Sequence, residues 1–278
     1  MKTFYTVNEL KQELSKVARA DVGFVPTMGA LHAGHRSLVE KARRECKVVV
    51  VSVFVNPTQF NDPKDLERYP RTLENDCAIL EQCGAQIAFA PSVSEIYPEP
   101  DTRLFSYPPT DSVMEGARRP GHFNGVCQIV SKLFQMTDPD RAYFGEKDYQ
   151  QIAVIRRMVE DQKFKVNIIP CPVIREDDGL AMSSRNTLLS QEEKEIAPNI
   201  YRILKESKTL GLPIEETQKW VVSQINAIEG LEVEYYSIVD GDTLAEISDW
   251  SQAPSVVGCI TVYCGKTPIR LIDHIRYK

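Results

Sequence analysis

The chain has 278 residues, a formal net charge of −6 at pH 7, 42% hydrophobic residues and 26% charged residues. A chain of this length can bury a sizeable core as one large domain or two smaller ones. The negative charge argues against a nucleic-acid-binding surface, which needs clustered lysine and arginine side chains.

The cysteines and the apolar runs indicate in which cellular compartment the protein works. The seven cysteines are odd in number and no two have the Cys-x-x-Cys spacing, which favours buried free thiols in a reducing compartment over disulfides or a zinc site. The first residues lead into a polar helical pattern instead of an apolar signal segment, and the apolar run at residues 48–55 is too short to span a bilayer. We therefore expect a cytoplasmic protein with no membrane or nucleic-acid partner.

The first elements have clear start and stop signals. Thr6 and Glu9 have the spacing of a capping box and predict a helix that starts at residue 7. An apolar run at residues 22–25 predicts a strand that Pro26 ends. The continuous valine-rich run at residues 47–54 predicts a second strand, covered on both faces as in parallel sheets.

The segment between these two strands carries the most distinctive residues of the chain. Gly29 suits a turn with positive φ, and Gly34 leaves room for a close approach to the backbone. A helical pattern begins near His32 and His35, which are three residues apart and would share one face of the first turn. A helix N-terminus has unpaired N–H groups and suits an anion. The segment therefore indicates a nucleotide site, with a sharp turn carrying two surface histidines as the alternative.

Alternating strands and helices continue to residue 173. The sequence predicts a Pro- and Asp-rich loop at 61–70, a helix at 72–83 that ends before Gly84, a strand at 86–90, an irregular proline-rich connection at 91–109, a helix at 124–135, a strand at 141–144, a helix after Lys147 and a strand at 165–170. This order predicts an α/β domain over residues 1–173, with a Rossmann-like, doubly wound parallel sheet. In such sheets ligands bind outside the carboxyl ends of the strands.

A change in composition marks a second domain at residues 174–278. The sequence predicts a helix at 190–208, which opens with a capping box of Ser190 and Glu193, and a helix at 213–228. Strands follow at 233–239, 256–263 and 269–275. We expect a smaller C-terminal α+β lid domain with an antiparallel sheet.

Three further groups of polar residues stand where a ligand could reach them. Residues 183–185, Ser-Ser-Arg, offer two hydroxyl groups and a guanidinium that suit a triphosphate, although a solvated turn has the same sequence. Lys147 stands at a predicted helix start, where its charge adds to the attraction for anions, with a solvated lysine as the alternative. Gln59 and Gln151 could each hold a polar substrate or be ordinary solvated amides.

Five sequence blocks together resemble one enzyme family. They cover residues 26–35, 54–60, 119–123, 144–151 and 179–186. His-Ala-Gly-His at 32–35 and Met-Ser-Ser-Arg at 182–185 resemble the HxGH and KMSKS-type loops of the adenylate-forming nucleotidyltransferase superfamily, although the second loop has no lysine. All five blocks, in this order and over nearly the whole chain, resemble the pantoate–β-alanine ligase (pantothenate synthetase) family.

The resemblance implies ATP-dependent ligation of pantoate and β-alanine to pantothenate, on the route to coenzyme A, with Mg²⁺ accompanying ATP. The pantoate carboxylate would attack the α-phosphate and give pantoyl adenylate and pyrophosphate. The β-alanine amine would then displace AMP. The family also implies a homodimer.

The resemblance assigns roles to residues as well. The catalytic residues would be His32, His35, Lys147 and Arg185. The ATP-binding residues would be Met28, Gly29, Ala30, Leu31, His32, Ala33, Gly34, His35, Gly145, Glu146, Lys147, Asp148, Ile174, Met182, Ser183, Ser184 and Arg185. Gln59 and Gln151 would hold pantoate, Gln59 would also lie near β-alanine, and Asp76 would lie near Mg²⁺.

The chemistry suits these assignments. Neutral amides can orient the hydroxyl groups of pantoate without pairing with its carboxylate, and cations can neutralise the charge that builds on the phosphate oxygens. We infer that His35 donates a hydrogen bond to phosphate more than it acts as a titrating acid. Because an acyl adenylate hydrolyses readily, residues 115–119 and the second domain would cover it.

Other functions would use some of the same features. A nucleotidylyltransferase that moves AMP onto a phosphate would use the same two phosphate loops but would not respond to β-alanine. A nucleotide-binding module without chemistry would need no pocket for an acid, so Gln59 and Gln151 count against it. A tRNA-charging enzyme is disfavoured by the short chain and the negative charge.

Overall fold

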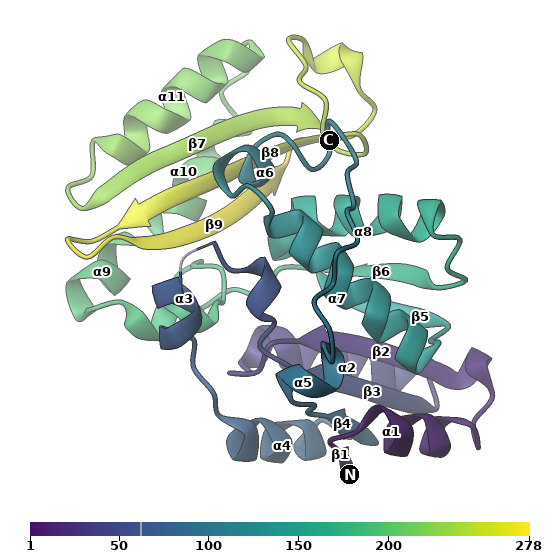
Figure 1. Cartoon of the computed structure of the whole chain (residues 1–278). Coiled ribbons are helices and arrows are strands. Elements are labelled where there is room, and N and C mark those ends of the chain that lie inside the picture. The colour runs from purple at the N-terminus through teal and green to yellow at the C-terminus, as the bar shows by residue number, and fades with distance from the viewer. Residues whose placement is uncertain (62) are drawn as a thin grey trace.

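A computed structural model describes residues 1–61 and 63–278, and it contains two sheets (Figure 1). The larger sheet has six parallel strands in the order β1-β4-β3-β2-β5-β6, and the smaller has three antiparallel strands in the order β7-β8-β9. The parallel strands are β1 (Lys2–Phe4), β2 (Val22–Thr27), β3 (Val48–Val53), β4 (Ile87–Phe89), β5 (Arg141–Gly145) and β6 (Asn167–Cys171). The antiparallel strands are β7 (Leu231–Asp240), β8 (Val256–Cys264) and β9 (Ile269–Arg276). The predicted fold class is confirmed.

The helices fill the predicted connections. Those of the first part are α1 (Val7–Leu14), α2 (Ala33–Glu45), α3 (Pro63–Arg68), α4 (Leu73–Gln82), α5 (Val93–Ile96), α6 (Glu115–Arg118), α7 (His122–Thr137) and α8 (Tyr149–Asp161). Those of the C-terminal part are α9 (Gln191–Ile196), α10 (Asn199–Ser207) and α11 (Ile214–Asn226). Both predicted capping boxes are present, at the starts of α1 and α9.

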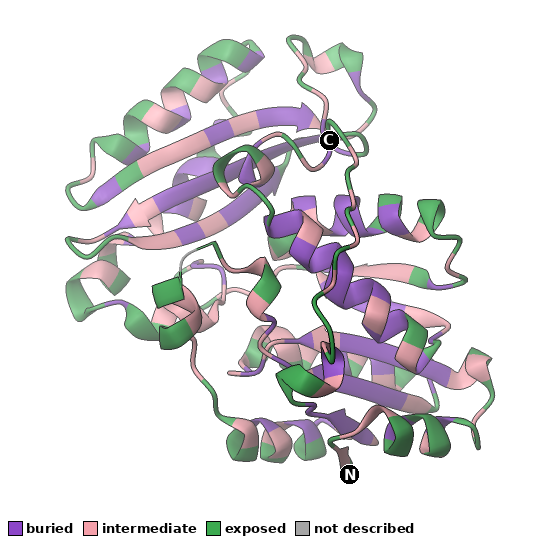
Figure 2. Ribbon diagram, in the orientation of Figure 1, coloured by how far each residue is buried: buried purple, intermediate pink, exposed green. Residues whose placement is uncertain are grey.

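The parallel sheet is covered on both faces. Phe24 and Val50 point to the face that α1, α7 and α8 cover, whereas Val25 and Val51 point to the face that α2 and α4 cover. Figure 2 shows the central strands β2 and β3 mostly buried and the helices exposed on their outer sides. Full burial of an apolar side chain such as valine stabilises the fold by roughly 1.5–3 kcal/mol. Because helices cover both faces of the sheet, every position of β3 favours an apolar residue, which explains its continuous valine run.

The antiparallel sheet joins the two parts of the molecule. One of its faces packs on α10 and α11. On the other face, Val257 and Cys259 pack against Met114, next to α6, and Ala153 of α8. Figure 1 shows α6 beside β8. The boundary between residues 173 and 174 stays a prediction.

One predicted stop signal is corrected by the structure. The prediction that Pro26 ends the first strand was wrong, because β2 continues to Thr27. Thr27 directs its C=O to Phe54 and its N–H to Ser52, on the β3 side, so Pro26 faces the other side, where pairing with β5 ends at Phe24. The missing proline N–H therefore interrupts no ladder bond.

Three other predictions are corrected by the structure, and one strand was not predicted. The predicted irregular connection at 91–109 contains the short helix α5, which begins after the N-cap Ser92. The helix predicted at 190–208 is two helices, α9 and α10, because the chain turns at Ala197 and Pro198. The predicted loop at 61–70 contains the short helix α3, and position 62 lies outside the described residues. Strand β1 was not predicted, because three residues with no apolar alternation form a strand only when β4 supplies the partner.

The cysteines and the helix lengths agree with the composition. All seven cysteines are free, and six of them are buried. Among the described residues, no helix has the length and the apolar character needed to cross a bilayer.

Helix α7 approaches one strand-end loop very closely. The 3₁₀ turn η2 (Pro57–Gln59) follows β3 and contacts α7 at Gly125. A Cβ atom at Gly125 would overlap the carbonyl group of Thr58 and lie 2.8 Å from Cα of Gln59. Glycine is required here because only a bare backbone leaves room for the turn.

We expect Gly125→Ala to lower the free energy of unfolding by about 1–3 kcal/mol, the usual range for overpacking a closed site. Thermal and denaturant unfolding would measure it. Gln135→Ala, an exposed change on the same helix, is the control and should be nearly neutral. Equal stability of both variants and wild type would show that the contact is not tight.

Candidate active site

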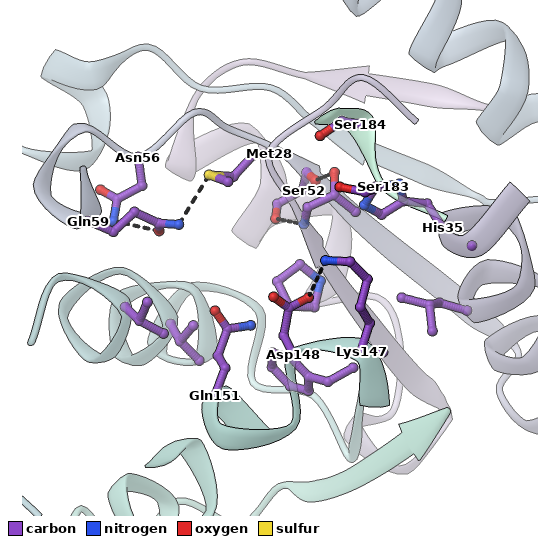
Figure 3. A pocket seen from close by; sticks show the side chains of 18 of the residues that line it. Met28, His35, Ser52, Asn56, Gln59, Lys147, Asp148, Gln151, Ser183 and Ser184 are labelled. Atoms are coloured by element: carbon purple, nitrogen blue, oxygen red, sulfur yellow. Dashed lines mark hydrogen bonds and ion pairs between the residues drawn. The ribbon is translucent and has the colours of Figure 1, made fainter. Parts of the chain in front are cut away.

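A cavity of about 240 Å³ opens at the carboxyl ends of β2, β3 and β5 (Figure 3). Strands β3 and β4 lie to one side of β2, and β5 and β6 lie to the other, so the cavity sits where the strand order reverses. Ligands of open parallel sheets bind at this point. Residues 172–174 and 182–185, which connect to the C-terminal part, close the cavity from the opposite side.

The start of α2 presents two imidazoles to the cavity. His32 is the N-cap, and its Nδ1 accepts a hydrogen bond from the Gly34 N–H at 3.1 Å. Nδ1 of His35 accepts from the His32 N–H at 3.3 Å. Because a nitrogen that accepts carries no proton, each neutral ring carries its proton on Nε2. A Cβ atom at Gly34 would lie 2.8 Å from the His32 ring, so the glycine permits this cap.

Both imidazoles are neutral near pH 7. Burial and then the charge of Lys147 lower the pKa of His32 to about 4. Burial, followed by His32 and Lys147, lowers the pKa of His35 to about 3. The pair therefore offers neutral N–H donors, the state expected of groups that bind phosphate oxygens.

Asp76 holds the turn that leads into α2. Its Oδ1 accepts from the Leu31 N–H at 2.8 Å, and its Oδ2 accepts from the Ala30 N–H at 3.1 Å and the Thr72 hydroxyl at 3.2 Å. The carboxylate is fully buried and does not line the cavity. Gly29 and Ala30 both have positive φ, 84° and 51°, as was predicted for Gly29. Asp76 thus stabilises a strained turn, and its predicted place near Mg²⁺ stays a prediction.

The cavity wall is rich in positive charge. Arg119, Lys147 and Arg185 line it, and Asp148 is the one acid among the described lining residues. The Lys147 ammonium lies 4.0 Å from the Asp148 carboxylate, and Arg185 pairs with Asp65 of α3 at 2.9 Å. An excess of cations in a concave site attracts an anionic ligand.

Two neutral amides, of Gln59 and Gln151, also line the cavity. The Gln59 amide donates to the sulfur of Met28 at 3.2 Å and accepts from Asn56 at 3.1 Å, which fixes its orientation. Gln151 projects from the first turn of α8, and its amide has no hydrogen-bond partner among the described residues. Figure 3 shows the two amides on opposite sides of the same space.

One apolar wall completes the cavity. It is formed by four residues of α7 at helical spacing, Val126, Ile129, Val130 and Leu133. These positions were predicted only as the buried stripe of a helix. The wall suits an aliphatic group on a small ligand.

The structure brings most of the predicted site residues together. The cavity is lined by Met28, His32, Gly34, His35, Gln59, Gly145, Lys147, Asp148, Gln151, Ile174, Met182, Ser183, Ser184 and Arg185. The predicted residues that do not line it are Gly29, Ala30, Leu31, Ala33, Glu146 and Asp76. Glu146 instead lies 3.3 Å from Arg276 of β9.

Sequence reasoning missed six polar lining residues, Thr27, Ser52, Asn56, Tyr69, Arg119 and His122. Arg119 and His122 lie in the block at 119–123, for which no substrate contact was predicted, although residues 115–119 were predicted to cover the site. The sequence signal that could have identified these two residues is an arginine followed three residues later by a histidine, just before a predicted helix.

The described residues contain no cluster suited to a bare metal ion. No group of three or more histidine, cysteine, aspartate or glutamate side chains in residues 1–61 and 63–278 could hold one. A divalent ion at this site would therefore depend on ligands from a bound phosphate, as is usual for Mg²⁺.

Comparison with known proteins gives one family. The family model described as pantoate-beta-alanine ligase matches residues 2–276. A protein of Bacteroides fragilis (strain YCH46) named pantothenate synthetase is 59% identical over 282 residues, covering all of this chain and 99% of that protein. The Thermus thermophilus protein of the same name is 47% identical, with 99% of each chain covered.

Solved structures agree with the sequence comparison. The crystal structure of pantothenate synthetase from Thermus thermophilus matches with a TM-score of 0.93 at 45% identity, covering 100% of this chain and 99% of that one. The pantoate-beta-alanine ligase of Francisella tularensis, described as complexed with beta-gamma ATP and beta-alanine, matches with a TM-score of 0.84 at 36% identity, covering 100% and 98%.

The four histidines of the chain give a direct test of the site's hydrogen bonds. We expect His32 and His35 to carry their proton on Nε2, and His122 to carry it on Nδ1, because that nitrogen donates to the Gln59 carbonyl at 2.8 Å. Long-range ¹H–¹⁵N spectra of histidine-labelled protein, assigned with single His→Gln variants, would distinguish these tautomers.

The same spectra test the protonation states. Burial comes first among the causes that lower the pKa of all four histidines, to about 4 for His122, so none should titrate near the ordinary value of 6.5. The unfolded chain binds protons at these rings near pH 6.5 and the folded chain does not, so stability should fall as pH falls from 7 toward 4. A His35 ring that titrates near pH 6.5 would contradict this account.

Asp76→Asn separates the positioning role from a metal role. We expect a loss of about 1–3 kcal/mol in unfolding free energy, because the Asn NH₂ group would face a backbone N–H that now has no acceptor. The concentration of Mg²⁺ needed for half-maximal activity should stay as in wild type. Glu74→Gln, exposed on the same helix, is the control. A changed Mg²⁺ requirement with unchanged stability would favour the metal role.

Proposed function

The chain belongs to the pantoate–β-alanine ligase family, and we propose that its cavity joins pantoate to β-alanine through a pantoyl adenylate formed from ATP. The observation that carries the proposal is a single cavity in which two neutral imidazoles and three cations stand near two neutral amides and an apolar wall. The Francisella tularensis relative, described with beta-gamma ATP and beta-alanine, supports these two as substrates.

In the proposed first step, a pantoate carboxylate oxygen attacks the α-phosphorus of ATP, and the bond to pyrophosphate breaks. Both reactants are anions, so the barrier depends on neutralising the phosphate oxygens. We assign that task to Lys147 and Arg185, with Nε2–H donors from His32 and His35. The start of α2 adds its unpaired N–H groups and the positive end of the helix dipole.

The amides and the apolar wall fit the acid substrate. Pantoate carries two hydroxyl groups, a carboxylate and a carbon with two methyl groups. We propose that Gln59 and Gln151 bind the oxygens and that Val126 and Val130 receive the methyl groups. A neutral amide leaves the carboxylate unpaired and therefore nucleophilic. Because Gln59 is held by Met28 and Asn56, its orientation is set before the substrate arrives.

In the proposed second step, the β-alanine amine attacks the acyl carbon, AMP leaves with the bonding electrons, and the amine loses a proton. Water would compete for the same carbon. Residues 172–174 and 182–185 cover the cavity from the C-terminal side, which supports the predicted lid role for that part of the chain. Glu115 supports a cover at residues 115–119, because it is bonded to Arg270 of β9 at 2.6 Å.

Three finer expectations remain proposals. We propose that Mg²⁺ enters with the ATP phosphates, where it would offset negative charge, since the described residues offer no metal cluster of their own. We also propose a homodimer and a cytoplasmic location, which rest on the family and on the free cysteines.

A two-stage assay tests the function. Protein, Mg-ATP and pantoate should release pyrophosphate, and AMP and pantothenate should appear only after β-alanine is added. Mass spectrometry identifies the product. Pyrophosphate release that does not need pantoate, or a final product formed without β-alanine, would favour a nucleotidylyltransferase.

We expect His35→Ala and Lys147→Ala each to slow single-turnover adenylation by about 10²-fold or more, the usual loss for one such donor. Arg156→Ala is the control, because it removes an exposed cation from α8 that does not line the cavity. Rates like those of wild type in the first two variants would refute the assigned roles.

A further inference from the structure

A second, smaller cavity adjoins the candidate active site. Its volume is about 60 Å³, and it lies between α6, the start of α8 and strands β8 and β9. It shares six lining residues with the larger cavity, Arg119, His122, Lys147, Asp148, Gln151 and Arg185. The two cavities therefore form one continuous space beside the pantoate amides.

Arg119 stands at the junction in a fixed orientation. One guanidinium nitrogen lies 3.2 Å from Nε2 of His122, whose Nδ1 lies 2.8 Å from the Gln59 carbonyl. Since the carbonyl can only accept, the proton of His122 is on Nδ1 and Nε2 accepts from Arg119. A chain of two hydrogen bonds thus ties the guanidinium to the backbone of a proposed substrate residue. Among the described residues, the guanidinium has no other hydrogen-bond acceptor.

Arg119 has no carboxylate within hydrogen-bond distance among the described residues. Arg185 has Asp65 at 2.9 Å. Glu115 lies 3.6 Å from Arg119, but both of its oxygens are bonded to Arg270 at 2.6 Å. The carboxylate nearest to Arg119 is therefore bonded to another arginine, Arg270, which also pairs with Glu234 at 2.6 Å.

The titration behaviour agrees with this charge balance. Burial, together with the nearby Arg185 and Arg270 charges, lowers the pKa of Arg119 although Glu115 raises it. Arginine nonetheless stays protonated in proteins. A half-buried guanidinium in this state gains most from an anionic ligand that has a planar pair of oxygens.

We propose that Arg119 binds the carboxylate of the amino-acid substrate and thereby selects an amine that carries an acid group. The inference rests on the proposed function and adds a residue that binds the second substrate, β-alanine. The pantoate carboxylate is a poor candidate for this contact, because pairing with a cation would weaken the nucleophile. The β-alanine carboxylate takes no part in the chemistry, so pairing costs no reactivity.

The position of Arg119 depends on the antiparallel sheet. Glu115, one turn earlier on α6, accepts hydrogen bonds from Arg270 of β9, from Thr261 of β8 at 2.8 Å and from Tyr235 of β7 at 2.9 Å. These bonds attach helix α6 to all three strands, and Figure 1 shows α6 beside β8. Arg119 follows this anchor directly and is placed at the cavity junction.

The test compares β-alanine with β-alaninamide, which has the same amine and no carboxylate. For each variant, the rate of pantoate-dependent ATP–pyrophosphate exchange measures how fast the adenylate forms. The rate of amide-bond formation is then divided by this exchange rate, so that only the second step is compared. We expect wild type to have a higher kcat/KM for β-alanine than for β-alaninamide. In Arg119→Gln this preference should fall by about ten- to a hundredfold, the range for a hydrogen bond to a charged group. The loss should come from a higher KM for β-alanine.

Two further variants make the result decisive. Arg119→Lys keeps the charge without the planar fork and should retain part of the preference. Arg118→Gln removes an exposed charge from the same helix that lines neither cavity, and should keep all of it. Unfolding curves identify any variant that fails to fold. If Arg119→Gln does not fold, the preference of Arg119→Lys for β-alanine over β-alaninamide decides whether the inference holds.

The contrary outcomes are distinct. An equal loss with both amines would make Arg119 a structural residue, and an unchanged preference would exclude it from the amino-acid site. A raised KM for pantoate in the exchange reaction, with the preference intact, would place the contact on the other substrate. All three overturn the inference. Failure of wild type to show pantoate-dependent exchange would instead overturn the proposed function.

Discussion

The site depends on one buried carboxylate that never touches the cavity. Asp76 accepts two successive backbone N–H groups, those of Ala30 and Leu31, and so holds a turn whose residues have positive φ. That turn decides where α2 begins and how its first residues face the strand ends. His32 and His35 then orient each other through the backbone of the same helix start. Removing the carboxylate would leave the imidazoles without a fixed frame.

The second constraint is the contact between the two sheets. The parallel sheet supplies the floor of the cavity, but its cover is attached to strands far along the chain. Arg175, near the cavity-lining residues 172–174, pairs with Asp273 of β9 at 2.6 Å, and Glu115 pairs with Arg270 of the same strand. The cover on both sides is thus anchored to one strand. The antiparallel sheet therefore positions site residues as well as stabilising its own core.

Much of this could be predicted from local sequence, and the remainder depends on distant partners. The valine run of β3 and the capping box of α1 are local signals, and both were predicted. Pro26 was misjudged because its effect depends on which neighbour its missing N–H faces, and that is set by the register with β3 and β5. The backbone contacts of Asp76 and the second cavity beside Arg119 were not predicted for a similar reason: the groups that form them lie far along the chain.

The charges of the cavity explain why its histidines must be neutral. In the proposed reaction Lys147 and Arg185 lie near the phosphates, and a protonated imidazole beside them would add repulsion and a second desolvated charge. Backbone N–H groups at the start of α2 donate to Nδ1 of His32 and of His35. These bonds favour the neutral imidazoles and leave their Nε2–H groups free to donate. In the proposed reaction the cations act on the phosphates, and the amides of Gln59 and Gln151 face an acid that has to stay reactive. The three kinds of group would then serve different parts of one reaction.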